Sequence, residues 1–310
     1  MNREVCKVQN WLVCNKLSVH YAKKTQFILF IPKAKTKEKP KEFNILMGGN
    51  VIEQTSTYKY LGVIIDENLN WVPQITKMCS KLSSVCGILS KVRHLLDRNS
   101  LMMIYNSLVE SRLRYGILSW STASEAQLQK LCVLQNKAIR YIHFSPPWTT
   151  ILPLYAHFKV LPLNKLILLQ QVTYMFNFHN GLLPEVFRTY CSKPAHRYNT
   201  RFAKTNYSLA PCRSAMIEKH SIKVIGPKVW TMVPEEAKIL PFRKSFAKHM
   251  KNLYLSEFPT EISIKDIISK NQAEKLKKWN DLNAIFQEDN EEIHLLGFDL
   301  ELEPVYWVDS

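Results

Sequence analysis

The spacing of apolar residues between Ile75 and Leu96 constrains the fold of this sequence more than any other feature. Apolar side chains recur there at steps of three and four residues, which is the period of an α-helix with one buried face. The positions are Ile75, Met78, Leu82, Val85, Leu89, Val92 and Leu96. Residues 43–71 instead alternate with a period of two, as β-strands do. The sequence therefore predicts a change from sheet to helix near residue 74.

Two further amphipathic helices are predicted after the first. The second has Asn99 or Ser100 as its N-cap and extends to about Tyr115. The third spans about 128–142, carries Gln135 on its apolar face, and ends before a Pro-Pro pair. With short connections, three such helices form a small bundle that is apolar inside and basic outside.

A small antiparallel sheet is predicted before the bundle. The segments FNILM and NVIEQ flank Gly48-Gly49-Asn50, which is a strong hairpin signal. The run YKYLGVIID at 58–66 is predicted as a third strand. The predicted fold class is therefore α+β and mostly helical, with four regions: 1–73, 74–148, 149–255 and 256–310.

The charge of the chain favours an anionic partner. Its 310 residues include 42 Lys and Arg against 26 Asp and Glu, a net charge of +16. Residues 256–310 hold 5 basic and 13 acidic residues, so the rest of the chain carries +24. Between Lys77 and Arg140 there are 10 basic and 3 acidic residues. Nucleic acid is the first partner that such a surface predicts, and a solvated helix face is the alternative.

Several classes of site and of protein are disfavoured by the sequence. The seven cysteines form no CxxC pair, and HExxH, GxSxG and P-loop motifs are absent. The prediction is that this chain holds no metal and no cofactor. The N-terminus has no apolar signal-peptide core, and the apolar stretch near 166–178 contains Gln170, Gln171, Thr173 and Asn177. We therefore expect an intracellular protein, nuclear or cytoplasmic, with no membrane partner.

Six segments of the sequence resemble one known family. They are NKLSVHYAKKTQFILF at 15–30, KYLGVIIDENLNW at 59–71, YNSLVESRLRYGILSW at 105–120, LQNKAIRYI at 134–142, and the pair HRYNTR at 196–201 and SIKVIGPKVWTMVPEEAK at 221–238. In this order they resemble the C-terminal part of the reverse transcriptases of jockey-type non-LTR retrotransposons, just beyond the catalytic palm strands. The resemblance covers roughly residues 11–250.

The resemblance implies a role for two parts of the chain. Residues 1–73 would be a palm remnant, and Lys59, Tyr60, Leu61 and Gly62 would correspond to the primer grip, a hairpin that holds the growing 3′ end. A glycine there permits close approach to a nucleic-acid backbone. The alternative is that Tyr60, Leu61, Val63 and Ile65 form the sheet core and Gly62 a bulge.

The helical bundle at 74–148 would then be the thumb, which contacts the phosphates of an RNA–DNA duplex. The nucleic-acid-binding residues that we expect are Lys24, Lys77, Lys81, Lys91, Lys130, Lys137 and Arg140. Residues 149–255 would be a mixed C-terminal domain, and 256–310 an acidic tail that is helical or disordered.

One departure from the family pattern decides the expected activity. The family places its metal-binding aspartates upstream of the NKLSV segment, and the ten residues that precede Trp11 in this chain contain no Asp. Asp66-Glu67 is no substitute, because adjacent strand residues point to opposite faces. We expect a fragment of an RNA-directed DNA polymerase that binds nucleic acid without catalysis, whereas the full-length enzyme would require Mg²⁺. The alternatives are a truncated gene model of an active enzyme, or a host-recruited protein-interaction module.

Overall fold

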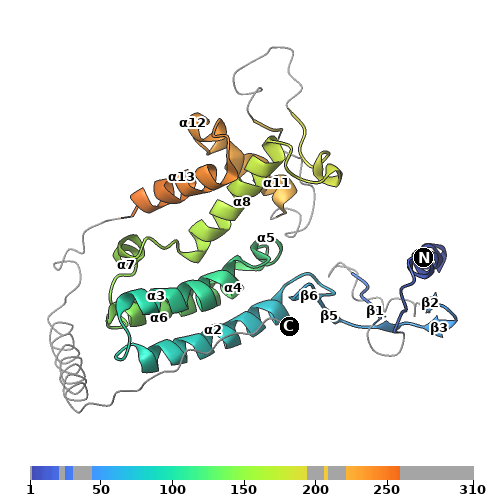
Figure 1. The fold of residues 1–310 in the computed structure, drawn as a ribbon, viewed down its shortest axis with the longest axis horizontal. Coiled ribbons are helices and arrows are strands. Elements are labelled where there is room, and N and C mark those ends of the chain that lie inside the picture. Colours follow the sequence, from blue (N-terminus) through green and yellow to red (C-terminus); the bar gives the residue numbers. More distant parts are fainter. Residues whose placement is uncertain (1, 21–24, 31–43, 194–205, 209–220, 259–310) are drawn as a thin grey trace, which may run out of the picture. The chain divides into compact units, whose positions relative to one another are not determined.

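The computed structural model describes residues 2–20, 25–30, 44–193, 206–208 and 221–258 (Figure 1). The order of elements changes from strands to helices near residue 72, as the sequence predicts. The N-terminal elements are α1 (Asn2–Cys14), β1 (Gln26–Phe27), β2 (Leu46–Met47), β3 (Asn50–Val51), β4 (Glu53–Gln54), β5 (Thr57–Tyr60) and β6 (Val63–Asp66). The described part of the chain is mostly helical with small sheets, which confirms the predicted fold class.

After β6, the described elements are helical, from α2 (Val72–Val92) to residue 256. They are α3 (Arg98–Tyr105), a π-helical turn (Asn106–Glu110), α4 (Ser111–Arg114), α5 (Ile117–Trp120), α6 (Glu125–His143), α7 (Leu152–His157), α8 (Leu163–His179), a 3₁₀ turn (Glu185–Phe187), α11 (Ile222–Thr231), α12 (Glu235–Lys238) and α13 (Arg243–Ser256). The three predicted bundle helices correspond to α2, to the segment that begins with α3, and to α6. The acidic tail beyond residue 258 lies outside the described residues.

In the part of the chain that the structure describes, the strands form three separate two-stranded pairs, so the prediction of one antiparallel sheet is wrong. β2 and β3 form the predicted hairpin around Gly48-Gly49, and β5 pairs with β6 in antiparallel fashion. β1 pairs with β4 in parallel. The long connection between β1 and β4 makes this possible, since parallel strands need a crossover of a dozen or more residues.

The prediction for 58–66 also needs correction. These residues form two strands and a turn, because Leu61 and Gly62 have φ angles of 44° and 86° and reverse the chain.

The predicted N-cap of the second bundle helix also needs correction. The N-cap of α3 is Asp97, whose carboxylate accepts hydrogen bonds from the backbone N–H groups of Asn99 (3.0 Å) and Ser100 (3.3 Å). A carboxylate at this position satisfies two helix-end donors at once.

The described residues divide into two compact units. One takes its residues from 1–81, 113–132 and 163–252, and the other from 82–112, 133–162 and 253–258. In the first unit, α8 packs against α11 and α5 packs against α8. A side chain at Gly226 would place its Cβ 2.6 Å from Met175 Sδ, so glycine lets α11 approach α8 this closely without a shift of the Met175 side chain. Trp120 and Trp230 are fully buried there, as core residues.

Candidate nucleic-acid interface

The β5–β6 hairpin places the four predicted primer-grip residues together at its tip. Tyr60 pairs with Val63 across the last step of the ladder, which leaves Leu61 and Gly62 as a two-residue turn. Both have positive φ, as the tightest hairpin turns require. Leu61 adopts this conformation although it has a Cβ, so its backbone is strained and must be held by its surroundings.

Tyr115 holds this turn in place. Its hydroxyl donates a hydrogen bond to the carbonyl oxygen of Leu61. A Cβ on Gly62 would lie 3.3 Å from Tyr115 Cε1, and a Cβ on Gly116 would lie 3.0 Å from Val63 Cγ2. Gly116 itself has a φ of 62°. Two glycines thus allow the hairpin and the corner between α4 and α5 to approach closely.

The tip is exposed to solvent. Tyr60 is 59% exposed, Leu61 73% and Tyr115 56%, and Lys59 is exposed too. The interpretation of Tyr60 and Leu61 as sheet core is therefore wrong. Val63 is half-buried, because it faces Gly116. An exposed pair of tyrosines beside a fixed backbone turn is a surface on which a base or a sugar can pack.

Asp66 fixes the exit from the hairpin. It is 5% exposed, and its carboxylate accepts hydrogen bonds from the backbone N–H groups of Asn70 (3.2 Å) and Trp71 (2.9 Å). Gln74 Oε1 accepts a further one from the N–H of Ile64 at 2.9 Å. The carboxylate of Asp66 is thus committed to the turn that leads into α2, and this gives it a structural role.

Three predicted lysines form a row on α2. Lys77, Lys81 and Lys91 are separated by four and ten residues, which places them within about 80° of one another around a helix of 3.6 residues per turn. Lys81 and Lys91 are exposed and Lys77 is half-buried. The row lies beside the buried stripe that includes Ile75 and Leu82, so the cations flank the core as predicted.

The predicted cations of α6 divide into two kinds. Lys130 and Lys137 are exposed and seven residues apart, on one side of the helix. Arg140 is half-buried, and its Nε and Nη2 donate to the carbonyl oxygen of Thr149 at 3.3 and 3.1 Å. Burial lowers the pKa of Arg140, which still leaves a guanidinium charged at neutral pH. It ties the segment after α6 to the helix, a role that the sequence did not reveal.

The last predicted site residue, Lys24, lies outside the described residues.

Arg93, which is not among the predicted site residues, packs on two aromatic rings. Its guanidinium carbon lies 5.6 Å from the ring centre of Tyr141 and 5.4 Å from that of Phe144. Lys137 Nζ is also 5.6 Å from the Tyr141 ring centre. Lys137 and Tyr141 are four residues apart on one helix, and this spacing could have predicted their contact from the sequence.

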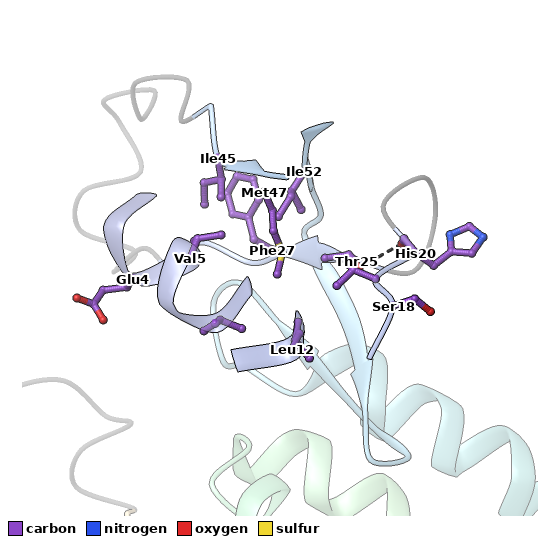
Figure 2. Close-up of a pocket in the computed structure, with 12 residues that line it drawn as sticks. Glu4, Val5, Leu12, Ser18, His20, Thr25, Phe27, Ile45, Met47 and Ile52 are labelled. Carbon is purple, nitrogen blue, oxygen red and sulfur yellow. Dashed lines mark hydrogen bonds between the residues drawn. The ribbon is translucent and has the colours of Figure 1, made fainter. Parts of the chain in front are cut away.

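An apolar hollow of about 670 Å³ lies elsewhere in the first unit. Figure 2 shows Val5 and Leu12 of α1 on one side of it and Ile45, Met47 and Ile52 on the other. The Thr25 hydroxyl donates to the carbonyl oxygen of His20 at 3.2 Å beside it. Its lining is mostly apolar and includes no Lys or Arg, so it is distinct from the basic surface.

The known proteins that the chain is similar to are RNA-directed DNA polymerases of mobile elements. Over 106 residues the chain is 30% identical to the RNA-directed DNA polymerase from mobile element jockey of Drosophila funebris, over 33% of this chain and 12% of the relative. It is 31% identical over 111 residues to the probable RNA-directed DNA polymerase from transposon BS of Drosophila melanogaster, with the same coverage. The corresponding X-element protein of that species is 26% identical over 95 residues, which is 29% of this chain and 10% of the relative.

These matches support a relation to the reverse transcriptases of non-LTR retrotransposons. The matched segments span about an eighth of the length of the first two relatives. No family model and no solved structure matches the chain. Among the described residues, no three His, Cys, Asp or Glu side chains are grouped so as to hold a metal ion. No helix in the described ranges is long and apolar enough to cross a membrane.

Proposed function

We propose that this chain is the C-terminal part of a reverse transcriptase and that it binds nucleic acid through a primer-grip hairpin and a basic thumb. The observation that carries the proposal is the β5–β6 tip, where a strained turn is held by Tyr115 and presents two exposed tyrosines. In this proposal residues 1–73 are the end of a palm and 74–148 the thumb. The similarity to RNA-directed DNA polymerases supports the relation on which both assignments rest.

The geometry of the tip suits a backbone more than a particular base. The turn presents an exposed main chain at Gly62, beside the Tyr115 ring, which occupies the side where a Cβ would point. Lys59 adds a positive charge one residue before Tyr60. Aromatic rings stack on any base, and lysines contact phosphates without regard to sequence. The expected ligand is therefore an RNA or an RNA–DNA duplex bound by its shape and charge.

Salt dependence tests the thumb. If Lys77, Lys81, Lys130 and Lys137 contact phosphates, binding of an RNA–DNA duplex releases counterions and log K falls linearly with log salt. Each contact that is lost reduces the slope by about 1. Changing all four lysines to Gln should flatten the slope by roughly 2–4 while the fold persists. Fluorescence anisotropy of a labelled duplex between 50 and 200 mM salt (about the range where such slopes are measured) gives this number.

The matched control changes Lys33, Lys35, Lys37 and Lys39 to Gln. This charged stretch is predicted as a loop from its sequence and lies outside the described residues. These four substitutions remove the same total charge as the four in the thumb. If binding depended only on net charge, the salt slope would change equally in both variants. Equal slopes would contradict the thumb assignment, and absence of binding would favour the protein-interaction alternative.

We propose further that the 310-residue protein does not polymerise nucleotides by itself. Two-metal phosphoryl transfer needs carboxylates that converge on two cations roughly 3.5–4 Å apart. The carboxylate of Asp66 is instead used by two backbone N–H groups. Purified protein that binds the duplex should therefore not extend its primer on an RNA template with Mg²⁺ or Mn²⁺. Primer extension that Asp66→Asn abolishes in a folded variant would contradict this proposal.

A further inference from the structure

Helix α13 carries a row of three lysines (Figure 1). Lys244, Lys248 and Lys251 follow one another at steps of four and three residues. This spacing brings them within about 60° of one another around a helix of 3.6 residues per turn. Lys244 and Lys248 are exposed and Lys251 is half-buried. None of the nucleic-acid contacts predicted from the sequence lies on this helix, and we refer to these three residues as the α13 row.

The buried side of α13 fixes the orientation of the row. Phe246 and Met250 are 0% and 1% exposed. The Phe246 ring stacks on that of Phe176 in α8, with 4.5 Å between ring centres, and its centre lies 6.1 Å from that of Trp230 in α11. The α13 row lies about 150° around the helix from Phe246 and Met250. The packing of α13 on α8 and α11 therefore turns the row toward solvent.

The helix has no acidic residue to balance the row. Its 14 residues include Arg243 and the three lysines but no Asp or Glu, so it carries a charge of +4 with His249 neutral. Pairs of opposite charge three or four residues apart, which stabilise many exposed helices, are therefore impossible within α13. In the part of the chain that the structure describes, no ion pair involves the α13 row.

The stability of α13 does not explain where its cations lie. The first turn of a helix carries a partial positive charge, so acidic residues are favourable there and cations are not. In α13 the first turn begins with Arg243 and Lys244 and holds no acidic residue, whereas the last turn, where cations are favourable, holds none. An anion bound along the row would offset the repulsion among the lysines and their unfavourable interaction with the dipole.

The length of the row suits a nucleic-acid strand. Lys244 and Lys251 are seven residues apart, which is about 10 Å along a helix that rises 1.5 Å per residue. Each strand of a double helix carries a phosphate about every 3.4 Å of its axis. The row therefore spans about three phosphates of one strand, one for each lysine.

Anionic lipid is the other polyanionic partner that a basic helix can have. Amphipathic helices of that kind bind a membrane by burying their apolar face among the lipids. In α13 the apolar side chains Phe246 and Met250 are already buried inside the protein. The row is left with charge as its means of binding, which favours nucleic acid.

We propose that the α13 row binds phosphates of the nucleic acid, as a contact additional to the hairpin tip and the thumb. This inference rests on the proposed function, since it assigns a further contact with the same partner. The contact is independent of base sequence, because lysines meet the phosphates and not the base edges. In this proposal the region 149–255 takes part in binding, whereas the sequence alone predicted only a mixed domain there.

Salt dependence of binding by the 310-residue protein tests this inference. The variant Lys244→Gln/Lys248→Gln/Lys251→Gln is compared with the wild type by anisotropy of a labelled RNA–DNA duplex at increasing salt. Each lost phosphate contact reduces the slope of log K against log salt by about 1, so we expect this variant to flatten the slope by roughly 2–3. Replacing the same lysines with arginine keeps their charge and should keep the slope. Circular dichroism verifies that both variants are folded.

The matched control changes Lys7, Lys16 and Lys159 to Gln. These lysines are exposed and lie outside α13, and their loss removes the same total charge. The control should leave the slope close to that of the wild type. Equal flattening in the control, or a wild-type slope in the α13 glutamine variant, would overturn the α13 row as a phosphate contact while the proposed function stands.

Two further results would exclude this role for the row. If the glutamine variant lost binding to phosphatidylserine vesicles and kept the wild-type slope for nucleic acid, the row would be a membrane contact and the inference would be wrong. Failure of the wild type to bind the duplex at any salt concentration would contradict the proposed function and, with it, this inference.

Discussion

Replacing Trp120 with alanine is expected to lower the free energy of unfolding by about 3–5 kcal/mol, the usual cost of truncating a fully buried tryptophan. Trp120 has no exposed surface, and it ends α5, which packs against α8. The loss would be a large fraction of the 5–15 kcal/mol that typically holds a domain together. Urea unfolding followed by circular dichroism measures it.

The same substitution should weaken nucleic-acid binding, for a local reason. The indole N–H of Trp120 donates to the carbonyl oxygen of Tyr115 at 2.9 Å, and the hydroxyl of Tyr115 donates to Leu61. The tryptophan therefore fixes the residue that holds the hairpin tip. Binding should fall even at temperatures where the variant remains folded.

Trp11→Ala is the matched control, since this side chain in α1 is largely exposed and its loss should change stability by about 0.5 kcal/mol or less. If the two tryptophan variants had equal stability, the assignment of Trp120 to the core would be wrong. If Trp120→Ala were unstable but bound with unchanged affinity below its unfolding transition, nucleic-acid binding would not depend on the hydrogen bond from Trp120 to Tyr115.

The helices of this fold could be predicted because their signal is local. The stripe from Ile75 to Leu89 is buried at every predicted position, since a period of 3.6 residues describes one helix without reference to the rest of the chain. The hairpin at β2–β3 was predicted for a similar reason, because Gly48-Gly49 reports a turn directly.

The sequence predicted one strand where β5 and β6 form a hairpin, because the turn between them begins with Leu61. A leucine with positive φ gives no turn signal in a sequence, and its conformation depends on Tyr115, 54 residues later. Arg140 illustrates the same limit. Its place on a basic helix predicted a phosphate contact, whereas its hydrogen bonds go to Thr149. Contacts of this kind depend on packing between segments that are distant in the sequence. The period of the apolar residues gives no information about that packing.

Replacing Gln135 with leucine should destabilise the second unit by about 1–3 kcal/mol for each buried polar group left without its partner. Gln135 is 1% exposed on the apolar face of α6, where a sequence alone gives no reason for an amide. Its Nε2 donates to the Tyr105 hydroxyl (2.9 Å) and to the Leu161 carbonyl (3.0 Å). Leucine has a similar volume, so the change removes these hydrogen bonds with little change in packing. Urea unfolding measures the loss.

Gln129→Leu is the control, because Gln129 lies on the exposed side of the same helix and its loss should stay within about 0.5 kcal/mol. A double-mutant cycle with Tyr105→Phe separates the two bonds. Phenylalanine removes the hydroxyl that Gln135→Leu leaves behind, so the double variant should cost less than the sum of the singles, by about 0.5–3 kcal/mol. Additive losses would mean that the Gln135–Tyr105 bond contributes nothing, and the loss in Gln135→Leu would then come from other contacts of Gln135, such as its bond to Leu161.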